Sequence, residues 1–312
     1  MKKLSPLLLS LILLLSACAS PAEPATLRMT VLPIIDALPM YVAQQEGLFA
    51  KHGVTVEFVP VASAPERDQI LAAGQADGTI NETLAVMAFN KETVQMQVVR
   101  YALRPAAEHG HFFIIASGQS GITDVNGLKG VEIGVSQGTV IEYVTERILQ
   151  AEGFSADEIK TIAVPKIPDR MALLASGELK AGVMPDPLAS LAVAQGGVVV
   201  ADDSKYPEYG FSVISFRKQV IDENAKAVEG FLAAIEEATA LVNTDPAKYK
   251  NLLSEQNLVP APLLDVYQAP VYPTAGVPTE AEWQDGLNWL KKKGMLDVDV
   301  SYADSVNASL LP

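Results

Sequence analysis

A faint internal repeat limits the possible folds more than any other feature of this sequence. Residues 65–80 begin Pro-Glu-Arg-Asp and residues 168–183 begin Pro-Asp-Arg-Met; both then run through two apolar residues, an alanine and a glycine into a short apolar stretch. Each copy has the pattern of a helix that ends at glycine before a strand, although two unrelated helix ends could share it. As a true repeat, it predicts that loops 33–38 and 136–139 occupy equivalent places, as do residues 81–83 and 184–186.

Strands alternate with helices around both copies. Alternating apolar residues predict strands at 27–31 and 54–61 with a helix between them, so that loop 33–38 ends where this helix begins. Such a loop can hold a polar group of a ligand, because the first N–H groups of a helix have no partner within it. The second copy predicts strands at 131–135 and 181–184. We therefore expect an α/β fold with largely parallel sheets.

Two continuous apolar runs, at 112–116 and 211–216, are typical of buried strands. We expect the chain to pass from one α/β unit to the other at 114–117 and to return at 210–212, which places a hinge there. After Arg217 the sequence predicts amphipathic helices that pack on the first unit. They span 225–242, 246–253, 262–266 and 278–293.

Three stretches of the chain resemble one protein family. They are Leu-Pro-Ile-Ile-Asp-Ala-Leu-Pro-Met-Tyr-Val-Ala from Leu32 with the Glu-Gly-Leu-Phe and Gly-Val-Thr-Val-Glu that follow it, Thr-Asp-Val-Asn-Gly-Leu-Lys-Gly at 123–130, and Trp-Leu-Lys-Lys-Lys-Gly-Met-Leu at 289–296. These stretches resemble the solute-binding proteins of the nitrate, sulfonate and thiamine-precursor ABC importer family (SsuA/THI5-like). The resemblance implies the type II periplasmic-binding-protein fold, in which two α/β lobes joined by two crossover strands close on a small molecule.

The domain boundaries follow from the apolar runs and the resemblance. Residues 27–115 and 212–312 are predicted to form lobe one, and residues 116–211 lobe two. The implied partners are the small-molecule ligand and the permease and ATPase subunits of an ABC importer, and we expect a monomer. A sensor or adhesin built from the same two lobes would have the same sequence pattern.

The N-terminus predicts export and a lipid anchor. Met-Lys-Lys, an apolar run at 7–15 and Leu-Ser-Ala before Cys18 are typical of a lipoprotein signal peptide over residues 1–17. Cys18 stands where such a signal places the lipidated residue; the alternative is an ordinary secretory signal with an incidental cysteine. Residues 18–26 then form a tether. We expect an extracytoplasmic protein anchored to the cell membrane through Cys18.

Charge excludes some partners. The formal net charge is −14, and removing residues 1–17 takes away Lys2 and Lys3 and leaves −16. So acidic a protein is repelled by phosphates and by anionic lipid headgroups, which disfavours nucleic acid and electrostatic membrane binding.

No catalytic constellation is recognisable in the sequence. His109-Gly-His111 could chelate a metal, but on a loop before an apolar run we interpret it as a surface pair. We expect no metal, no cofactor and no enzymatic activity. The competing class is an enzyme on the same fold, such as a pyrimidine synthase of thiamine biosynthesis.

The equivalent loops nominate the ligand-binding residues. Thr139, Asp36 and Asp186 could instead cap helices, and the aromatic residues could belong to the core. Gly138 would let the backbone approach the ligand, and the N–H groups around it would point into the cleft. The predicted set is Ile34, Asp36, Leu38, Ser63, Asn81, Glu82, Tyr101, Ser136, Gln137, Gly138, Thr139, Tyr143, Asp186 and Phe211.

The charges of this set indicate the ligand class. It contains Asp36, Glu82 and Asp186 but no arginine or lysine, and Arg67 and Arg170 are expected to face away from the cleft. An anion about 4 Å from a carboxylate costs about 4 kcal/mol at an effective dielectric of about 20. We therefore predict a nitrogen heterocycle such as a thiamine-precursor pyrimidine. The alternative is a sulfonate- or nitrate-type anion.

Overall fold

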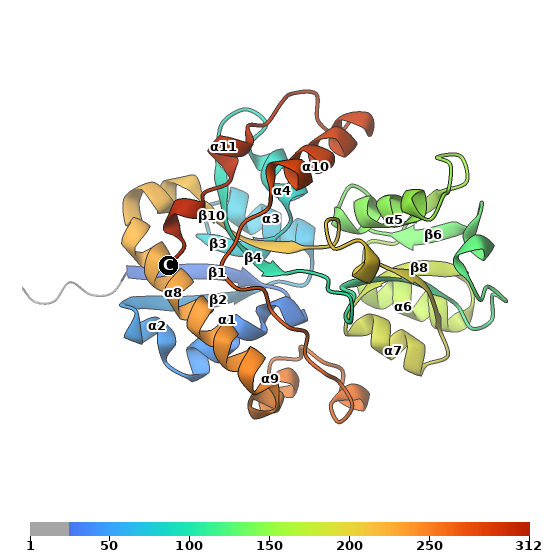
Figure 1. Ribbon diagram of the computed structural model, residues 1–312, viewed down its shortest axis with the longest axis horizontal. Helices are drawn as coiled ribbons and strands as arrows, with labels where there is room; N and C mark the ends of the chain where they lie inside the picture. Colours follow the sequence, from blue (N-terminus) through green and yellow to red (C-terminus); the bar gives the residue numbers. More distant parts are fainter. Residues whose placement is uncertain (1–24) are drawn as a thin grey trace, which may run out of the picture.

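The strands form two five-stranded sheets in the computed structural model, which describes residues 25–312. The strand orders are β2-β1-β3-β10-β4 and β7-β6-β8-β5-β9. The first sheet consists of β1 (Ala25–Val31), β2 (Val54–Pro60), β3 (Gly78–Asn81), β4 (Met96–Leu103) and β10 (Ser212–Arg217). The second consists of β5 (Phe112–Ala116), β6 (Glu132–Val135), β7 (Lys160–Ala163), β8 (Ala181–Pro185) and β9 (Val198–Asp202). Figure 1 shows the sheets as two separate bodies, which we call lobe one and lobe two.

Helices cover both sheets. Those of lobe one are η1 (Ile35–Ala37), α1 (Leu38–Gln45), α2 (Leu48–Lys51), α3 (Ala64–Ala72), α4 (Thr83–Phe89), α8 (Lys218–Thr244), η4 (Pro246–Tyr249), α9 (Lys250–Glu255), η5 (Ala261–Leu263), α10 (Glu280–Lys292), α11 (Tyr302–Ser305) and η6 (Ala308–Leu310). Those of lobe two are η2 (Val125–Leu128), α5 (Val140–Ala151), α6 (Ile167–Ser176), α7 (Leu188–Ala194) and η3 (Asp203–Lys205). Helix α8 begins earlier than the sequence predicts and has a break at Asn224.

The internal repeat is confirmed in three dimensions. In lobe one, β1 pairs in parallel with β2 and β3; in lobe two, β6 pairs in parallel with β7 and β8. Arg67 of α3 donates from Nη1 to the carbonyl of Ile80 in β3, and Arg170 of α6 donates from Nη1 to the carbonyl of Val183 in β8. Arg170 and Val183 occupy the positions of the second copy that correspond to Arg67 and Ile80 in the first. The two lobes thus use the same helix-to-strand contact.

The lobe boundary predicted at residue 115 is wrong. Strand β5 pairs antiparallel with β8 and β9, so residues 112–116 belong to the second sheet. The crossover segments are therefore 104–111, between β4 and β5, and 203–211, between β9 and β10, rather than 114–117 and 210–212. An apolar run identifies a buried strand, but it carries no information about which sheet the strand joins.

The predicted tether is too long at its C-terminal end. Ala25 and Thr26 already belong to β1, because they pair with Val54 and Thr55 of β2. Residues 1–24, which include the predicted signal peptide and Cys18, lie outside the described residues.

Helix α10 of lobe one contacts α5 of lobe two. Asp285 accepts from the Tyr143 hydroxyl and from Arg147 Nε, both at 2.7 Å. Lys293 pairs with Glu142 at 2.7 Å. These contacts join the two lobes along one flank of the crossovers.

Candidate functional site

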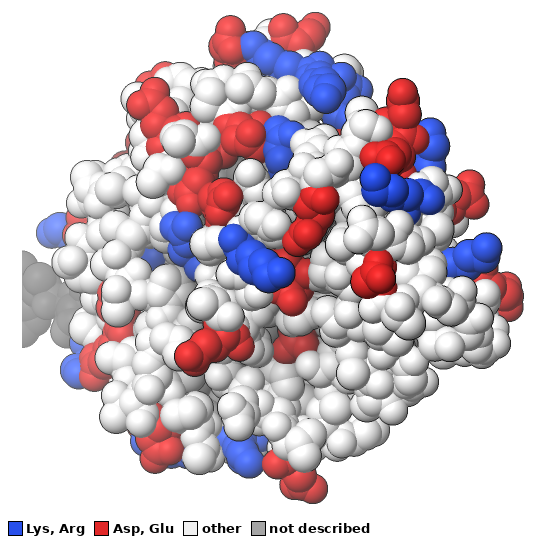
Figure 2. All heavy atoms as spheres, turned by 45° about the vertical axis from the view of Figure 1, so that its right-hand side comes forward, with Lys and Arg blue, Asp and Glu red and all other residues white. Residues whose placement is uncertain are grey.

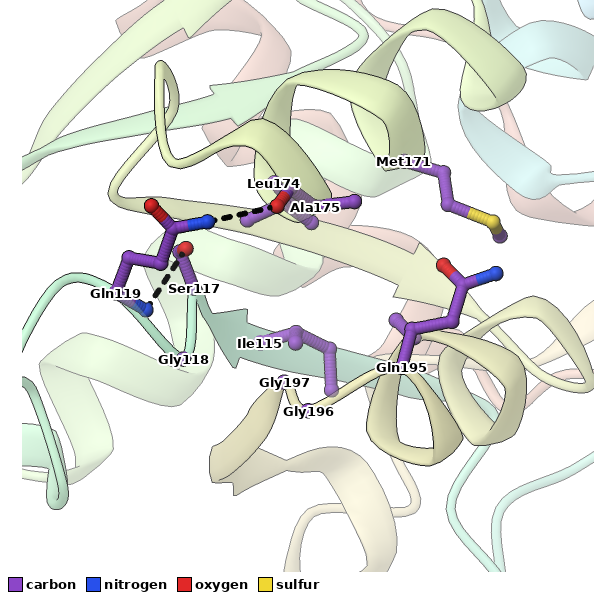
Figure 3. A pocket seen from close by; sticks show the side chains of 11 residues that line it. Ile115, Ser117, Gly118, Gln119, Met171, Leu174, Ala175, Gln195, Gly196 and Gly197 are labelled. Atoms are coloured by element: carbon purple, nitrogen blue, oxygen red, sulfur yellow. Dashed lines mark hydrogen bonds between the residues drawn. The ribbon is translucent and has the colours of Figure 1, made fainter.

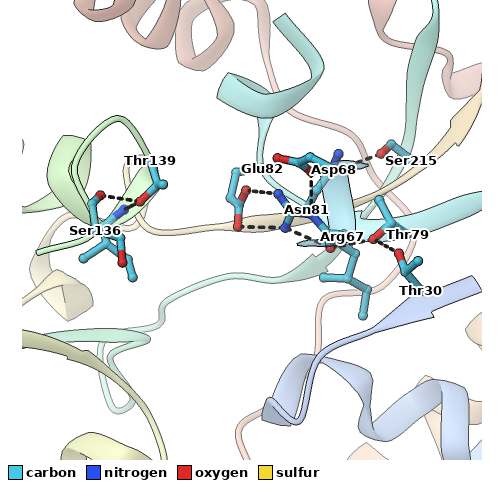
Figure 4. A network of polar contacts seen from close by, with 11 residues as sticks. Thr30, Arg67, Asp68, Thr79, Asn81, Glu82, Ser136, Thr139 and Ser215 are labelled. Carbon is cyan, nitrogen blue, oxygen red and sulfur yellow. Dashed lines mark hydrogen bonds and ion pairs between the residues drawn. The ribbon is translucent and has the colours of Figure 1, made fainter. Parts of the chain in front are cut away.

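The carboxyl end of one strand from each lobe lies on the side turned to the other lobe. Asn81 ends β3 of lobe one and Glu82 follows it, and Ser136 and Thr139 follow β6 of lobe two. Figure 4 shows the two pairs on opposite lobes, with the Glu82 carboxylate turned to Arg67 and the Asn81 amide turned to Ser215. We call these four residues the interlobe face. Figure 2 shows acidic side chains in the hollowed middle of the molecular surface.

Lobe one contributes a buried amide and a paired carboxylate to the interlobe face. The Asn81 side chain is fully buried; its Oδ1 accepts from Ser215 Oγ at 2.7 Å, while its Nδ2 has no hydrogen-bond partner. Glu82 pairs with Arg67 at 3.1 Å, and Asp68 pairs with the same guanidinium at 2.8 Å. The charge of Arg67 is thus compensated, and the Asn81 amide keeps an unused donor.

Lobe two contributes a helix start at which the N–H groups of Gly138 and Ile141 are already bonded. Thr139 caps α5 by accepting from the N–H of Ile141, and Glu142 Oε2 accepts from the N–H of Gly138 at 2.7 Å. Gly138 has φ +77°, a conformation that favours glycine. The prediction that the loop's N–H groups are free for a ligand is therefore wrong for Gly138, because Glu142 one turn into the helix takes that bond. Gln137 is exposed and donates to the Thr161 carbonyl.

The two repeat arginines do not face away from the cleft, contrary to the prediction. Their long side chains bond backbone carbonyl groups in or just after the strands, Ile80 in the case of Arg67 and Val164 and Val183 in the case of Arg170. Arg170 donates to the carbonyl of Val164 at 2.9 Å and to Ser136 Oγ at 2.8 Å. Burial lowers the pKa of Arg170 to about 10. Within residues 25–312 no carboxylate forms an ion pair with Arg170, so lobe two holds an uncompensated cation behind Ser136.

Asp36 binds the end of the crossover 104–111 and the start of β10 instead of facing the cleft. Its carboxylate lies 3.3 Å from His111 Nε2 and accepts from Ser212 Oγ. His111 Nδ1 lies 2.6 Å from the Gly210 carbonyl, so both ring nitrogens face acceptors. Burial opposes charge on His111, but Asp36 raises its pKa to about 9. Burial also opposes charge on Asp36, yet His111 holds the pKa of this carboxyl below its usual value.

Several other nominated residues lie in packed surroundings. Ser63 caps α3 by accepting from the N–H of Glu66. The Tyr101 hydroxyl donates to Glu282, and its ring contacts Arg104 and Phe211. Leu38, Tyr101, Tyr143 and Phe211 are each at most 5% exposed, and Ile34 is half-buried before η1. The aromatic residues therefore take the packing role that the sequence left open.

Asp186 points into a separate cavity of about 470 Å³, which we call the lateral cavity. Its Oδ1 accepts from Ser190 Oγ at 2.6 Å, and its Oδ2 lies 3.7 Å from His109 Nε2 without a hydrogen bond. The cavity lies between α7, the crossover 104–111 and the segment after η5. It is lined by Ala107, Glu108, His109, Gly110, Phe113, Asp186, Ser190, Asp202, Ser204, Leu263, Val266, Tyr267 and Gln268.

The two histidines of His109-Gly-His111 do not form a surface pair. His111 is 4% exposed and His109 is half-buried in the lateral cavity. Sequence reasoning missed His111, Arg170 and Tyr267 as parts of the region between the lobes. The pairing of arginines in the repeat was a signal for Arg170, but no local pattern distinguishes Tyr267 from a core tyrosine.

A second cavity of about 270 Å³ lies within lobe two, between α6, α7 and the end of β5. Figure 3 shows its polar side chains Ser117 and Gln119 bonded within the lobe. It contains no part of the interlobe face. Among the described residues, no three His, Cys, Asp or Glu side chains are placed to hold a metal ion. No helix within 25–312 is long and apolar enough to cross a membrane.

Comparison with known proteins identifies the family. A sequence model described as the NMT1-like family matches residues 20–254. The chain belongs to the NMT1-like family. A putative aliphatic sulfonates-binding protein of Escherichia coli (strain K12) is 24% identical over 270 residues, which are 85% of this chain and 82% of that relative. The family resemblance seen in the sequence is thereby confirmed.

Solved structures confirm the predicted periplasmic-binding-protein fold of this NMT1-like family member. The alkanesulfonate-binding protein SsuA from Xanthomonas axonopodis pv. citri, bound to MOPS, matches with a TM-score of 0.75 and 18% identity, over 92% of this chain and 99% of that chain. The periplasmic nitrate-binding protein NrtA from Synechocystis PCC 6803 matches with a TM-score of 0.71 and 16% identity, over 91% and 86% of the two chains.

Proposed function

We propose that this protein is the extracytoplasmic solute-binding component of an ABC importer. It captures one small organic molecule between its two lobes and delivers it to a permease that an ATPase drives. The NMT1-like family, the relatives named as binding proteins and the two lobes that face each other support this proposal.

Our choice of ligand rests on the Asn81 side-chain amide, whose Nδ2 has no hydrogen-bond partner, and on the neighbouring Glu82 carboxylate. A buried N–H group without a partner costs about 1–3 kcal/mol, which a ligand acceptor can recover. The carboxylate of Glu82, the next residue, already accepts from Arg67 and has further lone pairs for a ligand donor. A nitrogen heterocycle such as a thiamine-precursor pyrimidine presents an acceptor and a donor on neighbouring atoms, whereas a sulfonate or nitrate presents acceptors only. We therefore propose a nitrogen heterocycle as the ligand.

An anionic ligand is the second candidate, and Arg170 favours it. This cation behind Ser136 lacks a carboxylate partner among residues 25–312, and its charge would attract a sulfonate, although the Ser136 hydroxyl already donates to the Pro165 carbonyl at 2.9 Å. The names of the relatives also favour an anion. However, Arg170 already donates to Val164, Val183 and Ser136, so the guanidinium would act on the ligand through its charge.

A thermal-shift screen of pyrimidines, flavins, amines, sulfonates and nitrate tests the ligand class. Saturable stabilisation by a nitrogen heterocycle is expected, since a ligand that binds only the folded state raises the melting temperature. Stabilisation by sulfonates alone would replace the heterocycle with the anion.

Asn81→Leu is expected to weaken binding of the best heterocycle of this screen by about 10-fold, because it removes the free donor. Ser215→Ala is the matched control. Both variants lose the hydrogen bond between Asn81 and Ser215, which costs about 1 kcal/mol of folding free energy, but Ser215→Ala keeps the donor and should keep the affinity. Isothermal titration calorimetry measures both. Equal affinities of the two variants would remove Asn81 from the site.

We also propose that the mature protein is held at the membrane by lipid on Cys18. Metabolic labelling with palmitate should label the wild type, and Cys18→Ala should lose the label. A label that persists in the variant would refute the lipid anchor.

A further inference from the structure

Helix α10 is attached to lobe one through its N-terminal half. Gly286 lies so close to α4 that a Cβ atom there would come within 3.0 Å of the Leu84 side chain. Trp283 is 1% exposed and donates from Nε1 to the Val300 carbonyl at 3.0 Å. These contacts are made within lobe one, so this half of the helix moves with that lobe.

The other half of α10 lies on helix α5 of lobe two, as Figure 1 shows where α10 extends past α4. Asp285, Trp289 and Lys293 follow one another at intervals of four residues, which places them on one face of α10. Their partners share one face of α5 in the same way, and they are Glu142, Tyr143, Glu146 and Arg147. We call the two sets of residues together the clasp.

The charges of the clasp are complementary along its length. Asp285 accepts from Arg147 Nε at 2.7 Å, at one end of the contact. Lys293 pairs with Glu142 at 2.7 Å and with Glu146 at 2.9 Å, at the other end. If either helix ran in the opposite direction, like charges would face each other at both ends. The charge pattern therefore specifies this one alignment of α10 on α5.

The middle of the clasp is buried. Trp289 is 1% exposed, and its ring meets the Tyr143 ring edge-on with the centroids 5.6 Å apart. Its Nε1 donates to Glu146 at 2.7 Å. Exposed ion pairs by themselves contribute little, but separating the lobes at this flank would also expose the tryptophan ring and break its hydrogen bond. Separation is therefore disfavoured.

The clasp is bonded to the loop of lobe two that carries Ser136 and Thr139. Glu142 is 3% exposed; its Oε1 accepts from Lys293, and its Oε2 accepts from the Gly138 N–H. Both bonds are 2.7 Å long. A single buried carboxylate thus joins the end of a lobe-one helix to the loop that faces lobe one.

We propose that the clasp is a noncovalent connection between the lobes, in addition to the two crossovers, and that it restrains them from moving apart. Asp285, Trp289 and Lys293 act as positioning residues: they lie outside the interlobe face but set the distance between its two sides. This inference goes beyond the proposed solute-binding function. It concerns the protein without a ligand, so its failure would leave solute binding untouched.

Pulsed electron paramagnetic resonance on the ligand-free protein tests the clasp. Gln69 and Ala172 are exposed and occupy the same place in the two copies of the repeat, one on each lobe, so both are changed to cysteine for spin labels in a Cys18→Ser background. Asp285→Arg and Lys293→Glu should each give longer and broader distances, because like charges then face each other across the clasp.

The matched control reverses a charge within one lobe. Lys129→Glu places like charges together opposite Glu158 of lobe two, 2.9 Å away in the native pair, and should leave the distances unchanged. The Asp285 and Arg147 side chains are 39% and 15% exposed, so their substitution leaves the core of each lobe intact, which circular dichroism checks.

A charge swap separates the ion pair from other effects of substitution. Arg147→Asp alone should lengthen the distances, whereas Asp285→Arg combined with Arg147→Asp should restore the wild-type distribution, because the pair forms again with its charges exchanged. If a reversal variant does not fold, Asp285→Asn removes the charge without adding one and should also lengthen the distances. Unchanged or shorter distances in these variants, or a swap that does not restore them, would overturn the clasp.

Discussion

Replacing Asp36 with alanine is expected to lower the free energy of unfolding by about 3–5 kcal/mol, because it leaves His111 buried without its carboxylate. The Asp36 side chain is fully buried and joins the loop after β1 to His111 of the crossover 104–111 and to Ser212 at the start of β10. Its loss removes the counter-charge of His111 and the hydrogen bond from Ser212. Urea unfolding monitored by circular dichroism measures the change.

A double-mutant cycle separates the ion pair from simple packing. The double variant Asp36→Ala/His111→Gln should lose less unfolding free energy than the sum of the losses of the two single variants. The reason is that His111→Gln removes the unpaired histidine that Asp36→Ala leaves behind. Full additivity would show that the two side chains do not interact.

Stability is expected to fall by on the order of 3 kcal/mol as the pH rises from about 6.5 to above 9. The pKa of His111 is raised to about 9 in the folded protein, against about 6.5 in an unfolded chain. A raised folded pKa contributes stability that is fully present below the unfolded pKa and is lost as the pH passes the folded one. Burial raises the pKa of Asp203, which bonds the His111 backbone N–H, to about 7, so its titration lies at the lower end of this range.

His111→Gln should flatten the pH dependence of the unfolding free energy between pH 7.5 and 9.5. The matched control is His52→Gln, which makes the same change at a partly exposed histidine that contacts Glu237, away from the crossovers. In this control the unfolding free energy should still fall as the pH rises. A wild-type protein that is equally stable at pH 7 and pH 9.5 would contradict the charged state assigned to His111.

The alternation of strands and helices was sufficient to predict the two α/β lobes. Local patterns fix where a helix ends at glycine or where an apolar strand lies, and the repeat joined those patterns into two similar units. Pairing between strands depends on contacts far apart in the sequence. This is why residues 112–116 were recognised as a strand but placed in the wrong sheet.

The candidate site was predicted less well, because its chemistry depends on where side chains point. Asn81 and Ser136 lie at the strand ends where the repeat placed them. Asp36 and Asp186 have the predicted backbone positions, but their carboxylates turn to His111 and to Ser190. Arg170 was predicted to face away from the cleft, but its side chain bonds Ser136. A position at the start of a helix does not reveal how far a long side chain reaches.

The central claim, capture of a solute between two lobes, is tested most directly by a distance measured across the interlobe face. Gln69 of α3 and Gln137 are exposed, one on each lobe, and Cys18 is the single native cysteine. Spin labels on Gln69→Cys and Gln137→Cys in a Cys18→Ser background report this distance by pulsed electron paramagnetic resonance. With the compound that stabilises the protein most in the screen, the distribution should shift to shorter distances and narrow, as the lobes close about the crossovers. An unchanged distribution at saturating compound would contradict capture between the lobes.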